Sequence, residues 1–103
     1  MAAELFWTPQ AEQDLVEVYY FIALDSPRAA DRLLDRLQSR VEMLVLNPRI
    51  YQRRPDIRPS TRILVEGPYL VLYETHPDTD DAPVDAVEIV RVVDGRRNLK
   101  NMF

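Results

Sequence analysis

Apolar and polar residues alternate along this chain with two different periods, and the change of period divides it into two parts. Between residues 9 and 47, apolar residues recur every three or four positions, as they do on one face of a helix. From residue 62 onward they form short runs rich in β-branched and aromatic residues, separated by turn-forming residues. The pattern predicts two helices followed by several strands.

The helices have recognisable starts and stops. A short strand at residues 5–7 precedes Thr8-Pro9, which suits the N-cap and first turn of a helix, and Ser26-Pro27 repeats this signal before a second helix that Asn47-Pro48 ends. Three carboxylates, Glu12, Asp14 and Glu17, lie towards the start of the first helix, where the helix dipole favours them. The expected buried stripes are Ala11, Leu15, Val18 and Ile22, then Ala30, Leu33, Leu34, Leu37, Val41 and Leu44.

Strands at residues 62–65 and 69–73 are expected to pair through the turn Glu66-Gly67-Pro68. The longest strand, residues 84–93, is apolar on both faces, so we expect it inside the sheet with cover on both sides. The predicted fold class is α+β: an N-terminal short strand and an antiparallel two-helix hairpin packed on one face of a small, mostly antiparallel sheet. We expect one domain over residues 1–103.

Composition narrows the classes of function. The formal net charge of -4 argues against a surface devoted to nucleic acid, and the absence of cysteine excludes disulfides and thiolate metal sites. We recognise neither a signal peptide nor a membrane-spanning run, so a cytoplasmic protein is expected. No cofactor or metal site is expected. The run Asp78-Thr79-Asp80-Asp81 resembles the start of a calcium loop, but Ala82-Pro83 follows where such a loop needs its glycine.

The charges are segregated along the chain. Residues 48–62 hold five arginines against Asp56 alone, and residues 89–103 hold four bases against Asp94, whereas residues 63–88 hold seven acids and no base. All thirteen bases except Lys100 are arginine, which favours fixed, fork-shaped contacts. Two basic segments on either side of an acidic hairpin suggest a docking surface.

Six segments in a fixed order carry a resemblance: Trp7-Thr8-Pro9-Gln10-Ala11-Glu12-Gln13-Asp14-Leu15, Tyr20-Phe21-Ile22-Ala23, Ser26-Pro27-Arg28-Ala29-Ala30-Asp31-Arg32-Leu33, Leu44-Val45-Leu46-Asn47-Pro48-Arg49, Tyr69-Leu70-Val71-Leu72-Tyr73-Glu74 and Ile89-Val90-Arg91-Val92-Val93-Asp94-Gly95-Arg96-Arg97-Asn98. With these segments the chain resembles the ParE branch of the ParE/RelE superfamily of toxins from type II toxin-antitoxin modules. It departs from the family in lacking the glycine-arginine pair after the second helix, and in having Asp94 where histidine is common.

The resemblance implies a growth-inhibiting toxin that binds DNA gyrase without catalysis, and a ParD-like antitoxin whose C-terminal segment folds on binding and wraps the toxin. It implies no membrane partner and no sequence-specific binding of nucleic acid by the toxin alone. The expected antitoxin-binding and target-binding residues are Arg53, Arg54, Arg58, Arg62, Tyr73, Arg91, Arg96 and Arg97.

Two alternatives stay open at this point. RelE-like relatives cleave messenger RNA on the ribosome, which requires groups that move protons as well as cations. The chain has many arginines but only His76 and Lys100 as candidates for proton transfer apart from its carboxylates, among which Asp94 stands in the basic tail. A member without toxicity, acting through interaction only, is the other alternative.

Overall fold

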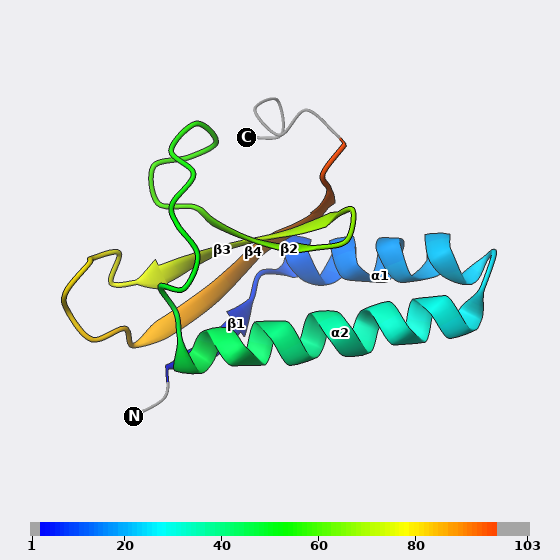
Figure 1. Ribbon diagram of the computed structural model, residues 1–103, viewed down its shortest axis with the longest axis horizontal. Coiled ribbons are helices and arrows are strands. Elements are labelled where there is room, and N and C mark those ends of the chain that lie inside the picture. Colours follow the sequence, from blue (N-terminus) through cyan, green and yellow to red (C-terminus); the bar gives the residue numbers. More distant parts are fainter. Residues whose placement is uncertain (1–2, 97–103) are drawn as a thin grey trace.

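A helical hairpin lies against one face of a four-stranded sheet in the computed structural model, which describes residues 3–96 (Figure 1). The elements in chain order are β1 (Glu4–Trp7), α1 (Pro9–Ala23), α2 (Pro27–Leu46), β2 (Arg62–Glu66), β3 (Tyr69–His76) and β4 (Ala86–Asp94). The predicted α+β architecture is confirmed. No helix in residues 3–96 is long and apolar enough to cross a membrane.

The sheet has the strand order β1-β4-β3-β2, so the last strand is an inner one, as predicted. β1 is parallel to β4, whereas β3 is antiparallel to both β4 and β2. Two predicted boundaries were wrong by a few residues. β3 continues to His76, and β4 begins at Ala86 rather than at residue 84.

The helix starts form as the sequence predicts. The hydroxyl of Thr8 accepts a hydrogen bond from the Ala11 amide at 3.0 Å, and that of Ser26 accepts one from the Ala29 amide at 3.2 Å. The stripe of α2 is buried except for Leu34, which is partly exposed. It forms the main core with β3 and β4 residues that include Val71, Tyr73, Val87 and Ile89.

A β-bulge in β4 changes which side chains face the helices. Leu72 of β3 is opposite Arg91 and Tyr73 is opposite Ile89, which leaves Val90 without a partner residue in β3. Beyond the bulge, Val93 forms a second small cluster with Ile63 and Leu72, against which Ile57 and Leu70 pack. Since Ile57 belongs to the loop between α2 and β2, that loop covers part of the sheet face away from the helices, consistent with cover on both sides of β4.

Candidate functional site

One edge of β4 is left open where β1 ends. β1 pairs only with residues 86–89 of β4, while β4 continues to Asp94, and α1 runs beside this remaining edge. Thr8 joins the two elements: its amide donates to the Ile89 carbonyl at 3.0 Å, and its hydroxyl donates to the Val90 carbonyl at 2.9 Å. The start of α1 therefore replaces a strand at this point of the edge.

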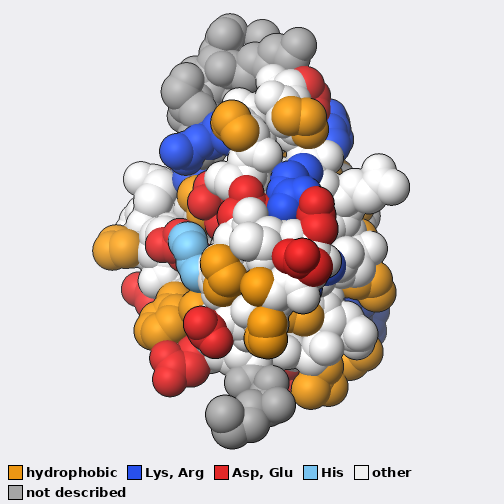
Figure 2. Space-filling model, turned by 90° about the vertical axis from the view of Figure 1, so that its left-hand side faces the viewer, with side chains coloured by type: hydrophobic (Ala, Val, Ile, Leu, Met, Phe, Trp, Pro, Cys, Tyr) orange, Lys and Arg blue, Asp and Glu red, His pale blue; other side chains and the backbone are white. Residues whose placement is uncertain are grey.

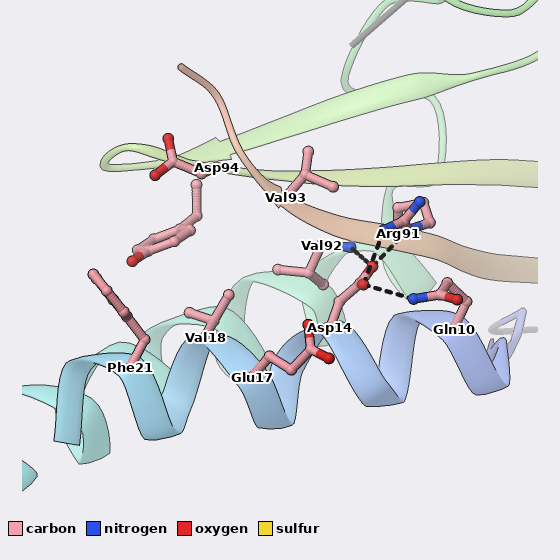
Figure 3. A pocket seen from close by; sticks show the side chains of 10 residues that line it. Gln10, Asp14, Glu17, Val18, Phe21, Arg91, Val92, Val93 and Asp94 are labelled. Carbon is pink, nitrogen blue, oxygen red and sulfur yellow. Dashed lines mark hydrogen bonds and ion pairs between the residues drawn. The ribbon is translucent and has the colours of Figure 1, made fainter. Parts of the chain in front are cut away.

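Asp14, six residues after Thr8, makes the next contacts between α1 and this edge of β4. Its Oδ2 accepts from the Val92 amide at 3.0 Å and from Arg91 Nε at 2.7 Å, and its Oδ1 accepts from Arg91 Nη2 at 3.0 Å and from Gln10 Nε2 at 2.9 Å (Figure 3). The Asp14 side chain is only 5% exposed and that of Arg91 20%. The pair fixes α1 to β4 by a bidentate contact in a largely dry place.

The electrostatics of this pair favour its charged form. Burial acts to raise the pKa of the Asp14 carboxyl, but the hydrogen bonds from Arg91, Gln10 and the Val92 amide outweigh it and lower that pKa below its ordinary value. The hydrogen bond to Asp14 raises the pKa of Arg91 in turn. A carboxylate held ionised by this many donors is a structural acceptor and a weak proton acceptor.

A groove of about 470 Å³ opens beside the pair, between α1 and the far half of β4. Its polar end is formed by Gln10, Asp14, Glu17 and Arg91, and its other end by Val18, Phe21, Tyr69, Val92, Val93 and Asp94 (Figure 3). Phe21 is 70% exposed although it lines this groove. The groove thus has the Asp14–Arg91 ion pair at one end and the uncovered Phe21 ring together with the Asp94 carboxylate at the other.

Three of the arginines predicted to bind a partner are already paired at the surface within the chain. Arg53 contacts Asp78 at 2.9 Å and Asp80 at 2.7 Å, Arg54 contacts Asp56 at 2.9 Å, and Arg96 pairs with Asp94. These pairs are exposed enough for each to be weak. Figure 2 shows basic and acidic side chains interspersed on the face it displays. The exposed surface around these arginines therefore carries both positive and negative charges.

Arg58 is exposed in the same loop as Arg53 and Arg54 and makes an interaction within the chain. Arg97 lies outside the residues that the structure describes.

Arg62 and Tyr73, the other two predicted contact residues, are buried at 4% and 0% exposure, so they do not form a surface here. Arg62 Nη1 donates to the Tyr51 carbonyl at 2.7 Å, and the Tyr73 hydroxyl donates to the Pro48 carbonyl at 2.9 Å. Both side chains hold the loop that carries the exposed arginines. Burial also raises the pKa of Tyr73 to about 12.

The single histidine lies away from this groove. His76 ends β3 opposite Ala86, at the other end of β4 from Asp94, and its Nε2 is 3.2 Å from Glu88 Oε1. The described groove side chains are carboxylates, an amide, an arginine, a tyrosine and apolar groups. They are suited to hydrogen bonding and apolar contact with another chain.

The importance of Asp14 was not predicted from the sequence, which placed it among the acids at the positive end of a helix. A signal was present, because Asp14 stands three residues after Ala11 and four before Val18, on the apolar stripe itself. A carboxylate on the buried stripe of a helix needs a donor partner in the fold. The sequence distance of 77 residues to Arg91 hides which one.

Comparisons with known proteins agree with this architecture. The family model of the ParE toxin of type II toxin-antitoxin systems, parDE, matches residues 5–99. Among solved structures, the chromosomal ParDE toxin-antitoxin system from P. aeruginosa matches with a TM-score of 0.69 and 21% sequence identity, covering 90% of this chain and 96% of that one. At this identity the structural match supports the fold. No curated protein sequence matches significantly.

Proposed function

The chain belongs to the ParE toxin family of type II toxin-antitoxin systems, and we propose that it inhibits growth by binding DNA gyrase until a ParD-like antitoxin covers it. The observation that carries this proposal is the family match over residues 5–99, which spans every described helix and strand from Leu5 onward.

A mode of action through binding rather than catalysis fits the composition of the groove. A ribosome-dependent nuclease needs positioned acid and base groups near its phosphate-binding cations. Here Asp14 accepts four hydrogen bonds from three residues, and His76 is at the opposite end of β4 from Asp94. A poison that stabilises one state of its target needs only a complementary surface.

We place the antitoxin on the groove between α1 and β4 and on the arginines beside it. Of the predicted binding residues, the accessible ones that the structure describes are Arg53, Arg54, Arg58 and Arg96, and Arg91 lines the polar end of the groove. Arg97 stays in the proposed set because of its position in the sequence. The antitoxin segment that fits here is acidic and carries apolar residues at intervals. Its carboxylates would replace Asp56 beside Arg54 and Asp94 beside Arg96, because these exposed pairs are weak. Its apolar side chains would cover Phe21.

The decisive experiment is a supercoiling assay with purified gyrase. We expect the toxin to inhibit supercoiling and to increase the amount of cleaved DNA held by the enzyme, and equimolar antitoxin to restore activity. In cells, induction of the toxin without antitoxin should trigger the SOS response and DNA breaks. Cleavage of translated messenger RNA without DNA damage would instead establish the RelE-like alternative.

Unimpaired growth after induction, with the protein shown to be folded and abundant, would indicate a member without toxicity. A matched control is the same induction with the antitoxin gene present. It separates the effect of free toxin from the burden of expression.

A further inference from the structure

Three side chains of types that commonly bind metal ions, Glu74, His76 and Glu88, lie close together on the sheet face away from the helices. Glu74 and His76 are two residues apart in β3 and therefore point to the same face, while Glu88 is directly opposite Glu74 in β4. Their intervening neighbours Tyr73, Thr75, Val87 and Ile89 are all fully buried on the helix side. The three side chains thus project away from the core.

We infer that Glu74, His76 and Glu88 form a binding site for a divalent transition-metal ion of the Zn²⁺ type. One ligand atom from each of them lies within 4.8 Å of the others. His76 Nε2 and Glu88 Oε1 are 3.2 Å apart. With Zn–N and Zn–O bonds of about 2.0–2.2 Å, tetrahedral donors lie about 3.3 Å from each other, so this pair has the required spacing.

The position of Glu74 opposite Glu88 is the second reason to infer a metal site here. Like charges directly opposite each other on neighbouring strands destabilise a sheet unless a cation lies between them. Residues 63–88 contain no lysine or arginine, and among the described residues no arginine forms an ion pair with Glu74 or Glu88. A bound dication would neutralise both carboxylates at once.

The type of ion follows from the ligands. An imidazole nitrogen with two carboxylate oxygens is a set that Zn²⁺ accepts, with a water molecule as the fourth ligand, whereas Ca²⁺ and Mg²⁺ require oxygen ligands in larger number. The His76 and Glu88 side chains are 51% and 38% exposed, so ion and water can reach them.

The first test uses the untagged full-length chain, treated with chelator and titrated with ZnCl₂. Because His76 is the only histidine in the sequence, the ¹⁵N resonances of its imidazole report on this site alone. We expect them to shift until one Zn²⁺ is bound per chain, and the same concentration of Mg²⁺ to leave them unchanged. Zinc binding without a change at His76, or no binding at millimolar zinc, overturns the inference.

Substitutions that keep the shape of the side chains complete the test. Glu88→Gln should weaken Zn²⁺ binding at least tenfold, while Asp81→Asn, an exposed acid in the neighbouring loop, should not. Glu74→Gln should raise the melting temperature of the metal-free protein and abolish the further rise that Zn²⁺ produces in the wild type. Equal zinc affinity in the Glu88→Gln and Asp81→Asn variants would contradict the assignment.

Discussion

At the scale of single residues, the most consequential side chains are polar ones that the fold has enclosed. Asp14, Arg62 and Tyr73 are each under 6% exposed, and each forms a hydrogen bond with a backbone group of another element or loop. Removing one partner of such a contact leaves the other buried and unpaired, which costs more than the contact contributes. These residues should therefore be sensitive to changes that preserve their size.

Asp14→Asn should lower the free energy of unfolding by about 2 kcal/mol at pH 7, because it removes the charge that Arg91 and the Val92 amide stabilise. The pKa of Asp14 is lowered by folding, so its contribution is present above the ordinary aspartate pKa and is lost as the pH falls through the folded-state value. Urea unfolding at pH 7 and pH 3 measures this.

The difference between wild type and Asp14→Asn should thus shrink at pH 3. Glu17→Gln is the matched control, since Glu17 lines the same groove but is exposed. A constant difference at both pH values would show that the carboxylate charge is not what matters.

Tyr73→Phe should leave the tyrosinate absorbance of the folded protein at pH 11 unchanged, because burial raises the pKa of Tyr73 to about 12 and the wild-type phenol stays neutral there. In urea, the wild type should show one tyrosinate more than the variant. The stabilisation that depends on the neutral phenol is complete below the ordinary tyrosine pKa and is lost as pH rises towards 12. A difference in the folded state at pH 11 would contradict this.

At the scale of elements, local sequence patterns were sufficient to identify each helix and strand of residues 3–96, although two strand boundaries were wrong by a few residues. Caps, proline positions and the two periodicities act within a few residues, and they located both helices and all four strands. The bulge in β4 and the partners of the buried charges were not predicted. They depend on pairs such as Asp14 and Arg91, which are distant in sequence and meet only after the sheet forms.

Thr8→Ala should destabilise the protein by about 1–2 kcal/mol, more than an ordinary cap, because the hydroxyl both caps α1 and donates to the Val90 carbonyl. Thr8→Ser retains the hydroxyl and should recover most of this loss. Thermal unfolding of both variants provides the measurement. An equal loss in both would assign the effect to the threonine methyl group instead.

Phe21→Ala should weaken binding of the antitoxin at least tenfold while changing the free energy of unfolding by less than about 0.5 kcal/mol, since Phe21 is 70% exposed on α1. Met43→Ala, a change at an exposed apolar residue of α2 outside the groove, should leave affinity unaltered. Titration calorimetry with purified antitoxin compares them. Equal affinities would move the interface away from the groove.

At the scale of the whole molecule, two loops depend on each other. Arg49, in the loop after α2, donates to the carbonyl groups of Thr79 at 2.6 Å and of Ala82, and Arg53 pairs with Asp78 and Asp80. The acidic segment around Asp78 and Asp80 is thus held by arginines of the preceding loop. Composition showed the segregated charges but not that they neutralise one another.

Arg49→Ala should accelerate amide hydrogen exchange in residues 77–85, because it releases two carbonyl groups of that loop. Exchange in α1 should stay as slow as in the wild type. Arg28→Ala, at an exposed position of α2, serves as the control and should change neither region. Uniform acceleration throughout the chain would indicate a global loss of stability instead of loop release.

The inner position of β4 also affects the order in which the chain can fold during its synthesis. β4 follows every other element in the chain, yet β1 joins the sheet only through it, and the groove cannot exist before it is in place. A polypeptide emerging from the ribosome can form the helical hairpin and the β2–β3 hairpin early, whereas pairing across such long sequence separations comes late. The surface on which we place the antitoxin is therefore complete only after β4 has paired, so an antitoxin that binds this groove distinguishes the folded chain from its earlier folding stages.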